Sequence, residues 1–214
     1  MLIQPQIEAV HELGLENHYR RISVETAGGE VWMRLYQAVN AKAGVIQVGG
    51  IGGDFDTPAK GLYSRLCEAL MEEEATALRV AFRDPTDLDE SVHDLLAGIR
   101  LLVRNGISRI GLVGHSFCGP VVITAGAVAP EVKTGVSLST QSYGTDRVDE
   151  LAPRSVLFIH GSEDEVLSPF CSIQTHRRAG EPKAIKILRG ARHVLDEAAE
   201  EVHSLVLDWL RRHL

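Results

Sequence analysis

Short apolar runs and longer helical patterns alternate along most of this chain. The short runs are rich in Val and Ile, which favours buried strands, whereas the longer segments repeat apolar residues every three or four positions, which favours helices. Strands are predicted over residues 43–48, 76–82, 109–113, 134–138, 155–160 and 183–188. Helices are predicted over residues 57–74, 87–105, 119–128, 169–179 and 194–212. Such repeated strand–helix units predict a mostly parallel, twisted sheet with helices on both faces.

The chain before residue 43 has a different pattern. Residues 20–26 and 30–37 alternate apolar and polar side chains, and Gly28-Gly29 between them is typical of a hairpin turn. This hairpin and the parallel units together predict a sheet of about seven or eight strands. No internal repeat, low-complexity segment or linker interrupts the pattern, so a single α/β domain over residues 1–214 is predicted.

Composition and charge argue against several classes of protein. The 214 residues are 44% hydrophobic and 24% charged, as in ordinary soluble domains, and the formal net charge is -7. Lys and Arg form no cluster of the kind that binds nucleic acid. The three cysteines, Cys67, Cys118 and Cys171, have no CxxC spacing, which argues against a disulfide framework and favours a reducing cytoplasm.

No targeting or membrane-spanning segment is predicted. The first five residues lack the basic region and apolar core of a signal peptide. Residues 110–130 carry no charge, but the glycines, His115, Ser116 and Pro120 among them favour a buried strand, a turn and a buried helix over a membrane span. We therefore expect a cytoplasmic protein whose partner is a small molecule, not a nucleic acid or a membrane. A homodimer is compatible with the sequence but not indicated by it.

A serine lies on the predicted turn between one of these strands and the following helix. The stretch is Gly114-His115-Ser116-Phe117-Cys118-Gly119. Such a turn holds the serine Oγ clear of the sheet, beside the N–H donors of the helix N-terminus, which suits a nucleophile. The usual pattern is Gly-x-Ser-x-Gly, so Cys118 stands where the second glycine is expected and Gly119 follows one place later. For this stretch alone, a plain glycine-rich turn is the alternative.

Two further reactive side chains follow predicted strands. Asp164 comes shortly after the strand 155–160, and His193 comes shortly after the last predicted strand. Because ligands bind beyond the carboxyl ends of parallel strands, Ser116, Asp164 and His193 are expected at one edge of the sheet. Asp164 lies between two glutamates, so a solvated acidic loop is one alternative, and a helix-capping histidine is the alternative for His193.

The chain order Ser, Asp, His resembles that of the α/β-hydrolase superfamily. The resemblance rests on Gly114-His115-Ser116, on His160-Gly161-x-x-Asp164 and on the loop bearing His193, and it extends from the early hairpin to the last helix. The chain looks like the small, lidless branch that includes dienelactone-hydrolase-like proteins and small carboxylesterases. Dienelactone hydrolases carry a Cys nucleophile where this chain has Ser116. The resemblance implies an α/β-hydrolase fold with a nucleophile elbow and no lid domain.

The resemblance and the chemistry of the three side chains imply a catalytic triad. His193 would take the proton of Ser116 as general base and return it to the leaving group. Asp164 would fix the tautomer of His193 and stabilise its charged form.

The glycine-rich loop after strand 43–48 has two interpretations. An oxyanion hole needs preorganised N–H donors. One is predicted at Phe117, and the other in this loop at Ile51, with Gly50 as the second choice. The rival is a dinucleotide site, but its fingerprint Gly-x-Gly-x-x-Gly ends here in Phe55.

No cofactor and no metal site are predicted. Cys118 could be a second nucleophile, but a small buried core residue is favoured. Glu200 and His203 have the spacing of a metal-ligand pair, yet they lie on an amphipathic helix with no second cluster, which favours a solvated face.

The segment before the acid-bearing strand is too short for a lid, so an open, shallow site is expected. The side chains predicted to line it are Phe55, Tyr143, Leu167 and Phe170. Together these features predict a serine hydrolase that cleaves small carboxylic esters through an acyl-enzyme. Amide, peptide or thioester hydrolysis by the same triad is one alternative. A non-catalytic ligand-binding protein of the same fold is another, because Cys118 could distort the elbow.

Overall fold

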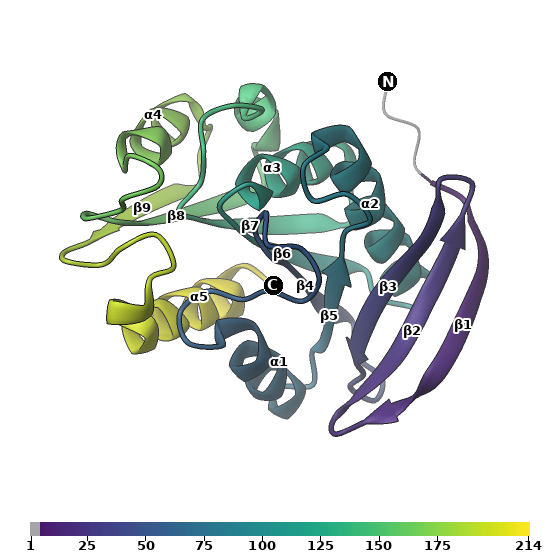
Figure 1. Cartoon of the computed structure of the whole chain (residues 1–214). Coiled ribbons are helices and arrows are strands. Elements are labelled where there is room, and N and C mark those ends of the chain that lie inside the picture. Colours follow the sequence, from purple (N-terminus) through teal and green to yellow (C-terminus); the bar gives the residue numbers. More distant parts are fainter. Residues whose placement is uncertain (1–4) are drawn as a thin grey trace.

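A nine-stranded mixed sheet runs through the computed structural model, which describes residues 5–214 (Figure 1). The strand order is β1-β2-β3-β5-β4-β6-β7-β8-β9. The strands are β1 (Ile7–Glu16), β2 (Tyr19–Thr26), β3 (Gly29–Tyr36), β4 (Ala43–Val48), β5 (Thr76–Ala81), β6 (Arg109–His115), β7 (Val132–Leu138), β8 (Ser155–Gly161) and β9 (Lys183–Leu188).

The sheet is parallel over its larger part. Strands β5, β4, β6, β7, β8 and β9 pair in parallel, whereas β1, β2 and β3 pair antiparallel and join the rest through an antiparallel contact between β3 and β5. The chain passes from β4 to β5 on one side and then returns to place β6 on the other side of β4. Ligands bind at such a switch point in open parallel sheets. The loops after β4 and β6 therefore mark the place to look for a site.

The sheet has one strand more than the upper end of the predicted range, because β1 was not predicted. Nearly all of β1 is exposed on both faces, and two irregularities in its pairing with β2 interrupt the register. A strand that buries neither face has no reason to alternate apolar and polar residues, so periodicity does not reveal it.

Helices cover both faces of the sheet, as predicted (Figure 1). Helices α1 (Leu62–Glu72) and α5 (Ala199–His213) share one hydrophobic core with the sheet. Helices α2 (Leu88–Arg104) and α3 (Cys118–Val128) share the core on the opposite face. Helix α4 (Phe170–Arg178) contacts the last two strands. The apolar stretch that includes α3 is thus a buried strand, turn and helix, and no helix within residues 5–214 is long and apolar enough to cross a bilayer.

Two predicted helices begin later than expected. Helix α1 starts at Leu62 instead of residue 57, because Ala59, Lys60 and Gly61 all have positive φ angles that a helix cannot accommodate. Helix α5 starts at Ala199 instead of residue 194, after a short 3-10 helix.

Residues 139–154 connect β7 to β8 and carry only the 3-10 helix η1 (Asp146–Leu151). The sequence predicted a loop here and did not identify η1, whose Val148 and Leu151 are buried against α3. No lid domain is inserted at this position.

The buried hydroxyl of Thr134 links two strands of the sheet to one helix. Thr134 Oγ1 on β7 accepts a hydrogen bond from Trp209 Nε1 on α5 at 2.8 Å and another from Ser155 Oγ on β8 at 2.7 Å. All three side chains are buried, so water cannot replace this acceptor.

Thr134→Val keeps the shape of the side chain but leaves two buried donors without their acceptor. We expect it to lower the free energy of unfolding by about 1–3 kcal/mol in urea denaturation. Combining it with Trp209→Phe should recover part of that loss by removing one orphaned donor. Thr124→Val is the matched control, since Thr124 is buried on α3 away from this network. An equal loss in the control would show that the hydroxyl network is not the cause.

Candidate active site

Ser116 occupies the turn between β6 and α3. Its φ angle is 57°, in the left-handed region that a residue with a Cβ rarely adopts. The turn is held at both ends, because the Ser116 N–H donates to the Leu138 carbonyl at 2.8 Å and the Gly119 N–H donates to the Ser116 carbonyl at 3.1 Å. A strained backbone at a reactive side chain is typical of a functional site.

Glycines on both sides allow this turn to pack closely. A Cβ on Gly114 would lie 2.5 Å from the Cys118 carbonyl oxygen, and a Cβ on Gly119 would lie 1.9 Å from Thr140 Oγ1. The close approach of helix to sheet is therefore made at Gly119, one residue later than in the usual pattern. Cys118 is fully buried in the core, where burial raises the pKa of its thiol well above the ordinary value. It is placed as a packing residue.

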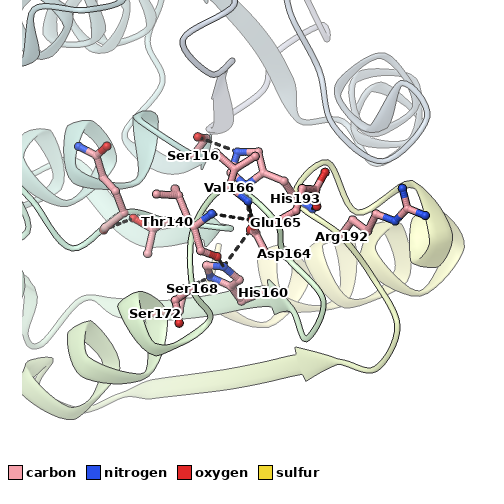
Figure 2. A network of polar contacts seen from close by, with 12 residues as sticks. Ser116, Thr140, His160, Asp164, Glu165, Val166, Ser168, Ser172, Arg192 and His193 are labelled. Carbon is pink, nitrogen blue, oxygen red and sulfur yellow. Dashed lines mark hydrogen bonds and ion pairs between the residues drawn. The ribbon is translucent and has the colours of Figure 1, made fainter.

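The structure brings the three predicted triad residues into one hydrogen-bonded chain (Figure 2). His193 Nε2 lies 2.9 Å from Ser116 Oγ, and His193 Nδ1 lies 2.8 Å from Asp164 Oδ2. Each residue comes from a different strand end: Ser116 follows β6, Asp164 follows β8 and His193 follows β9. The shared edge of the parallel strands thus collects side chains far apart in the sequence.

The carboxylate determines which nitrogen of His193 carries the proton. Burial raises the pKa of Asp164, but hydrogen bonds from the Leu167 N–H, from His193 and from the Val166 N–H outweigh it and leave the pKa below its ordinary value. An ionised carboxylate only accepts, so His193 Nδ1 carries the hydrogen and Nε2 is free to accept from the Ser116 hydroxyl. This is the arrangement that a general base for Ser116 requires.

His115 supports His193 from the side of the elbow. Its Nε2 lies 3.0 Å from the His193 carbonyl oxygen, and the two rings are 4.9 Å apart. Burial lowers the pKa of His115 to about 4, so it is neutral and donates from Nε2. The sequence placed His115 in the elbow stretch but did not reveal its contact with His193, since nothing in the local pattern links residues 78 positions apart.

The loop after β4 reaches the nucleophile. A Cβ on Gly50 would lie 3.6 Å from Ser116 Cβ, so this backbone passes directly beside the serine. Among residues 5–214, neither the Phe117 N–H nor the Ile51 N–H donates to a protein acceptor. The far end of the loop is held by Arg79, a buried side chain that donates to the Phe55 carbonyl. Of the predicted oxyanion donors, this contact places only the Gly50 backbone beside Ser116, and the donor roles of Phe117, Ile51 and Gly50 stay predictions.

The four predicted substrate-binding side chains differ in their surroundings. Tyr143 is 77% exposed and Phe170 is 50% exposed, so both are open to solvent. Leu167 is half-buried and its backbone takes part in the site, with its N–H donating to Asp164. The Phe55 ring instead packs against Arg34, whose Cζ lies 4.0 Å from the ring centroid, and the sequence had not indicated this contact.

Of the two residues with metal-ligand spacing on α5, Glu200 lies on a solvated surface as predicted, whereas His203 is half-buried and its Nε2 is buried. Glu200 pairs with Arg65, and Glu201 pairs with Lys186. In the part of the chain that the structure describes, no group of three or more His, Cys, Asp or Glu side chains is arranged to hold a metal ion.

The close packing at Gly119 makes a first prediction for this site. Gly119→Ala forces α3 away from the sheet, since its Cβ would collide with the side chain of Thr140. We expect a loss of about 2–3 kcal/mol in the free energy of unfolding. Gly126→Ala on the same helix meets only the flexible end of Leu151 at 3.0 Å, so its loss should stay below about 1 kcal/mol. Equal stabilities of the two variants in urea denaturation would contradict this account of the elbow.

His115 makes a second prediction, on stability against pH. Its pKa falls from the ordinary 6.5 to about 4 in the folded protein, so between these values the unfolded chain binds a proton that the folded chain does not. The free energy of unfolding should therefore fall as the pH is lowered from 7 to 4, with about 3 kcal/mol of that fall due to His115. The fall should be correspondingly smaller in His115→Asn and unchanged in the control His11→Asn, whose side chain is exposed. A pH dependence of His115→Asn identical to that of the parent would show that the group titrates normally.

Known proteins resemble this chain in structure, although no family model and no curated protein matches it by sequence. Solved structures do match over nearly the whole chain. Est1E from Butyrivibrio proteoclasticus superposes with a TM-score of 0.79 at 16% identity, covering 90% of this chain and 98% of that chain. A dienelactone hydrolase from Anabaena variabilis has a TM-score of 0.79 at 18% identity, covering 99% of this chain and 100% of the other.

A third similar structure is described as lacking a lid. XC6422 from Xanthomonas campestris, a member of the a/b serine hydrolases without lid, has a TM-score of 0.72 at 20% identity, covering 94% of this chain and 97% of that chain. At these identities the likeness concerns the fold. The strand order, the helices on both faces and these structural relatives show that the chain has the α/β-hydrolase fold of the small, lidless kind.

Proposed function

We propose that this protein is a serine hydrolase that cleaves small carboxylic esters through an acyl-enzyme. The observation that carries the proposal is the continuous hydrogen-bonded chain from Ser116 through His193 to Asp164 at the carboxyl edge of the sheet. A serine becomes a nucleophile when a base lies within hydrogen-bond reach and a third group orients that base. All three parts are present here.

The first half of the proposed reaction forms the acyl-enzyme. Ser116 Oγ attacks the carbonyl carbon of the ester while His193 Nε2 takes the hydroxyl proton. The negative charge on the carbonyl oxygen is stabilised by the N–H of Phe117 and by an N–H of the loop at Ile51 or Gly50. The tetrahedral intermediate collapses as the C–O bond to the alcohol breaks, and His193 returns the proton to the departing alcohol oxygen.

The second half regenerates the enzyme. Water attacks the acyl carbon, gives its proton to His193 Nε2, and the bond to Ser116 Oγ breaks as His193 protonates that oxygen. Asp164 stays ionised throughout and stabilises the imidazolium that forms twice in each cycle. Its lowered pKa supports this role near neutral pH.

The surroundings of the site favour small, apolar esters. Exposed apolar side chains occur on the segments that follow the parallel strands, namely Ile51, Tyr143, Val166 and Val194 on loops and Phe170 at the start of α4. No lid within residues 5–214 covers them, so the substrate is held mainly by contacts at an open mouth. Est1E, one of the structurally similar proteins, binds ferulic acid, so esters of aromatic acids belong in the substrate panel beside short alkyl esters.

A non-catalytic role has no specific observation in its favour. Such a role would require Cys118 to distort the elbow. The close approach at Gly119 and the 2.9 Å contact between Ser116 and His193 support a turn of ordinary shape.

Covalent labelling tests the proposal before any substrate is known. A fluorophosphonate should add once per chain, at Ser116, with the adduct measured by intact mass and mapped by peptide sequencing. Ser116→Ala should not label, and His193→Gln and Asp164→Asn should label and turn over p-nitrophenyl acetate about 10³–10⁴-fold more slowly. Ser108→Ala and His11→Gln, both at exposed positions away from the site, are the controls and should behave like the parent. A folded parent protein that neither labels nor hydrolyses the ester would refute the proposal.

A further inference from the structure

Asp164 contacts a second histidine besides His193 (Figure 2). His160 lies at the end of β8 with a side chain that is 0% exposed, and its Nε2 is 3.0 Å from Asp164 Oδ2. The same nitrogen is 3.0 Å from the Leu167 carbonyl oxygen. The other ring nitrogen, Nδ1, is 2.7 Å from the hydroxyl of Ser172 on α4. The proposed reaction does not use His160 or Ser172.

These contacts determine the tautomer of His160. Both neighbours of Nε2 are acceptors, a carboxylate and a carbonyl, so Nε2 carries a hydrogen. Burial is the main influence on the ring and lowers its pKa, although Asp164 opposes this, so His160 is neutral near pH 7. A neutral imidazole has one N–H, so Nδ1 is an acceptor and the Ser172 hydroxyl donates to it.

The carboxylate of Asp164 is thereby surrounded by N–H donors. The backbone N–H groups of Val166 and Leu167 donate to Oδ1 at 2.8 and 2.7 Å. His193 Nδ1 donates to Oδ2 at 2.8 Å. His160 Nε2 lies 3.0 Å from the same oxygen, while its hydrogen bond goes to the Leu167 carbonyl. The carboxylate therefore cannot rotate without breaking one of three hydrogen bonds to a charged group, which are among the stronger contacts in a protein.

We propose that His160 and Ser172 are positioning residues of the hydrolytic site: Ser172 fixes the His160 ring by donating to Nδ1, and the Nε2–H of that ring holds the Leu167 carbonyl and lies against Asp164 Oδ2, so that the turn bearing Asp164 stays oriented toward His193. The inference rests on the proposed hydrolase function. It links α4, which carries no triad residue, to the orientation of the general base.

The His160 N–H beside Oδ2 also has an electronic effect. Its positive end lies close to Oδ2 and offsets part of the carboxylate charge, so less of that charge stabilises the imidazolium form of His193. Removing that N–H removes this offset and favours the charged form of His193. The charged and titratable groups that face His160 are Asp164 and His193. A merely structural role for His160 would not move the pH dependence of the reaction.

The test uses Ser172→Ala and His160→Gln in the full chain, with Ser168→Ala as the control. Ser168 lies beside α4, and its hydroxyl accepts only from the Phe170 N–H within residues 5–214. Active sites are counted by fluorophosphonate labelling at Ser116, so that rates refer only to correctly folded protein. The pH dependence of kcat/KM is then measured with p-nitrophenyl acetate.

For His160→Gln we expect kcat/KM per active site to fall about 10- to 100-fold, the size associated with one hydrogen bond to a charged group. The fall should lie in kcat, with KM little changed, and the acid limb of the profile should move to higher pH. Ser172→Ala should show a smaller fall, of about 3- to 10-fold, and a shift in the same direction. Ser168→Ala should match the parent in both respects. If His160→Gln does not fold, the pH profile of Ser172→Ala is compared with those of the parent and of Ser168→Ala.

Histidine ¹⁵N NMR provides a readout that does not depend on turnover. In the parent protein, His160 should be neutral with its proton on Nε2, and Ser172→Ala should keep that tautomer but shift the Nδ1 resonance, because Nδ1 loses its hydrogen-bond donor. A parent that labels at Ser116 but has a charged or Nδ1–H His160 overturns the inference alone, as do variants whose pH profiles coincide with the parent. Absence of labelling in the folded parent overturns the proposed function itself.

Discussion

The buried carboxylate of Asp164 is the interaction on which the site depends. Its side chain is fully excluded from solvent, and an ionised carboxylate is tolerated there only because N–H groups replace the lost water. The donors come from its own turn and from the loop after β9. The turn after β8 and the loop after β9 must therefore fold correctly together before His193 can face Ser116. The neutral His115 adds a further support from the elbow.

Much of this arrangement was predictable because the carboxyl ends of parallel strands meet at one edge of the sheet. The buried strands β4 to β8 are recognisable as apolar runs, and their carboxyl ends meet on one side together with that of the edge strand β9. Ser116, Asp164 and His193 could therefore be grouped without knowing any distance. Choosing Asp164 over its glutamate neighbours needed a family resemblance as well. Glu165 accepts the backbone N–H of His193, whereas Asp164 reaches the ring.

What the sequence did not reveal are features without a local periodic signal. Strand β1 buries neither face, so no alternation marks it. The stacking of Phe55 against Arg34 and the contacts of His115 and His160 join residues brought near one another only by folding. The sequence shows a glycine at position 119, but it does not show that this glycine lies against Thr140, because Thr140 follows a different strand. Long-range polar contacts of this kind depend on tertiary geometry, which propensity and spacing do not encode.

The positive φ angle of Ser116 has a consequence for the stability of the folded chain. A non-glycine residue held in this region raises the energy of the folded state by about 1–3 kcal/mol, a penalty that glycine would not incur. A chain optimised for durability alone would carry glycine at the elbow and would lack the proposed nucleophile. The hydroxyl is thus retained against the thermodynamic preference of the scaffold, and the most stable version of this fold is one without the proposed nucleophile.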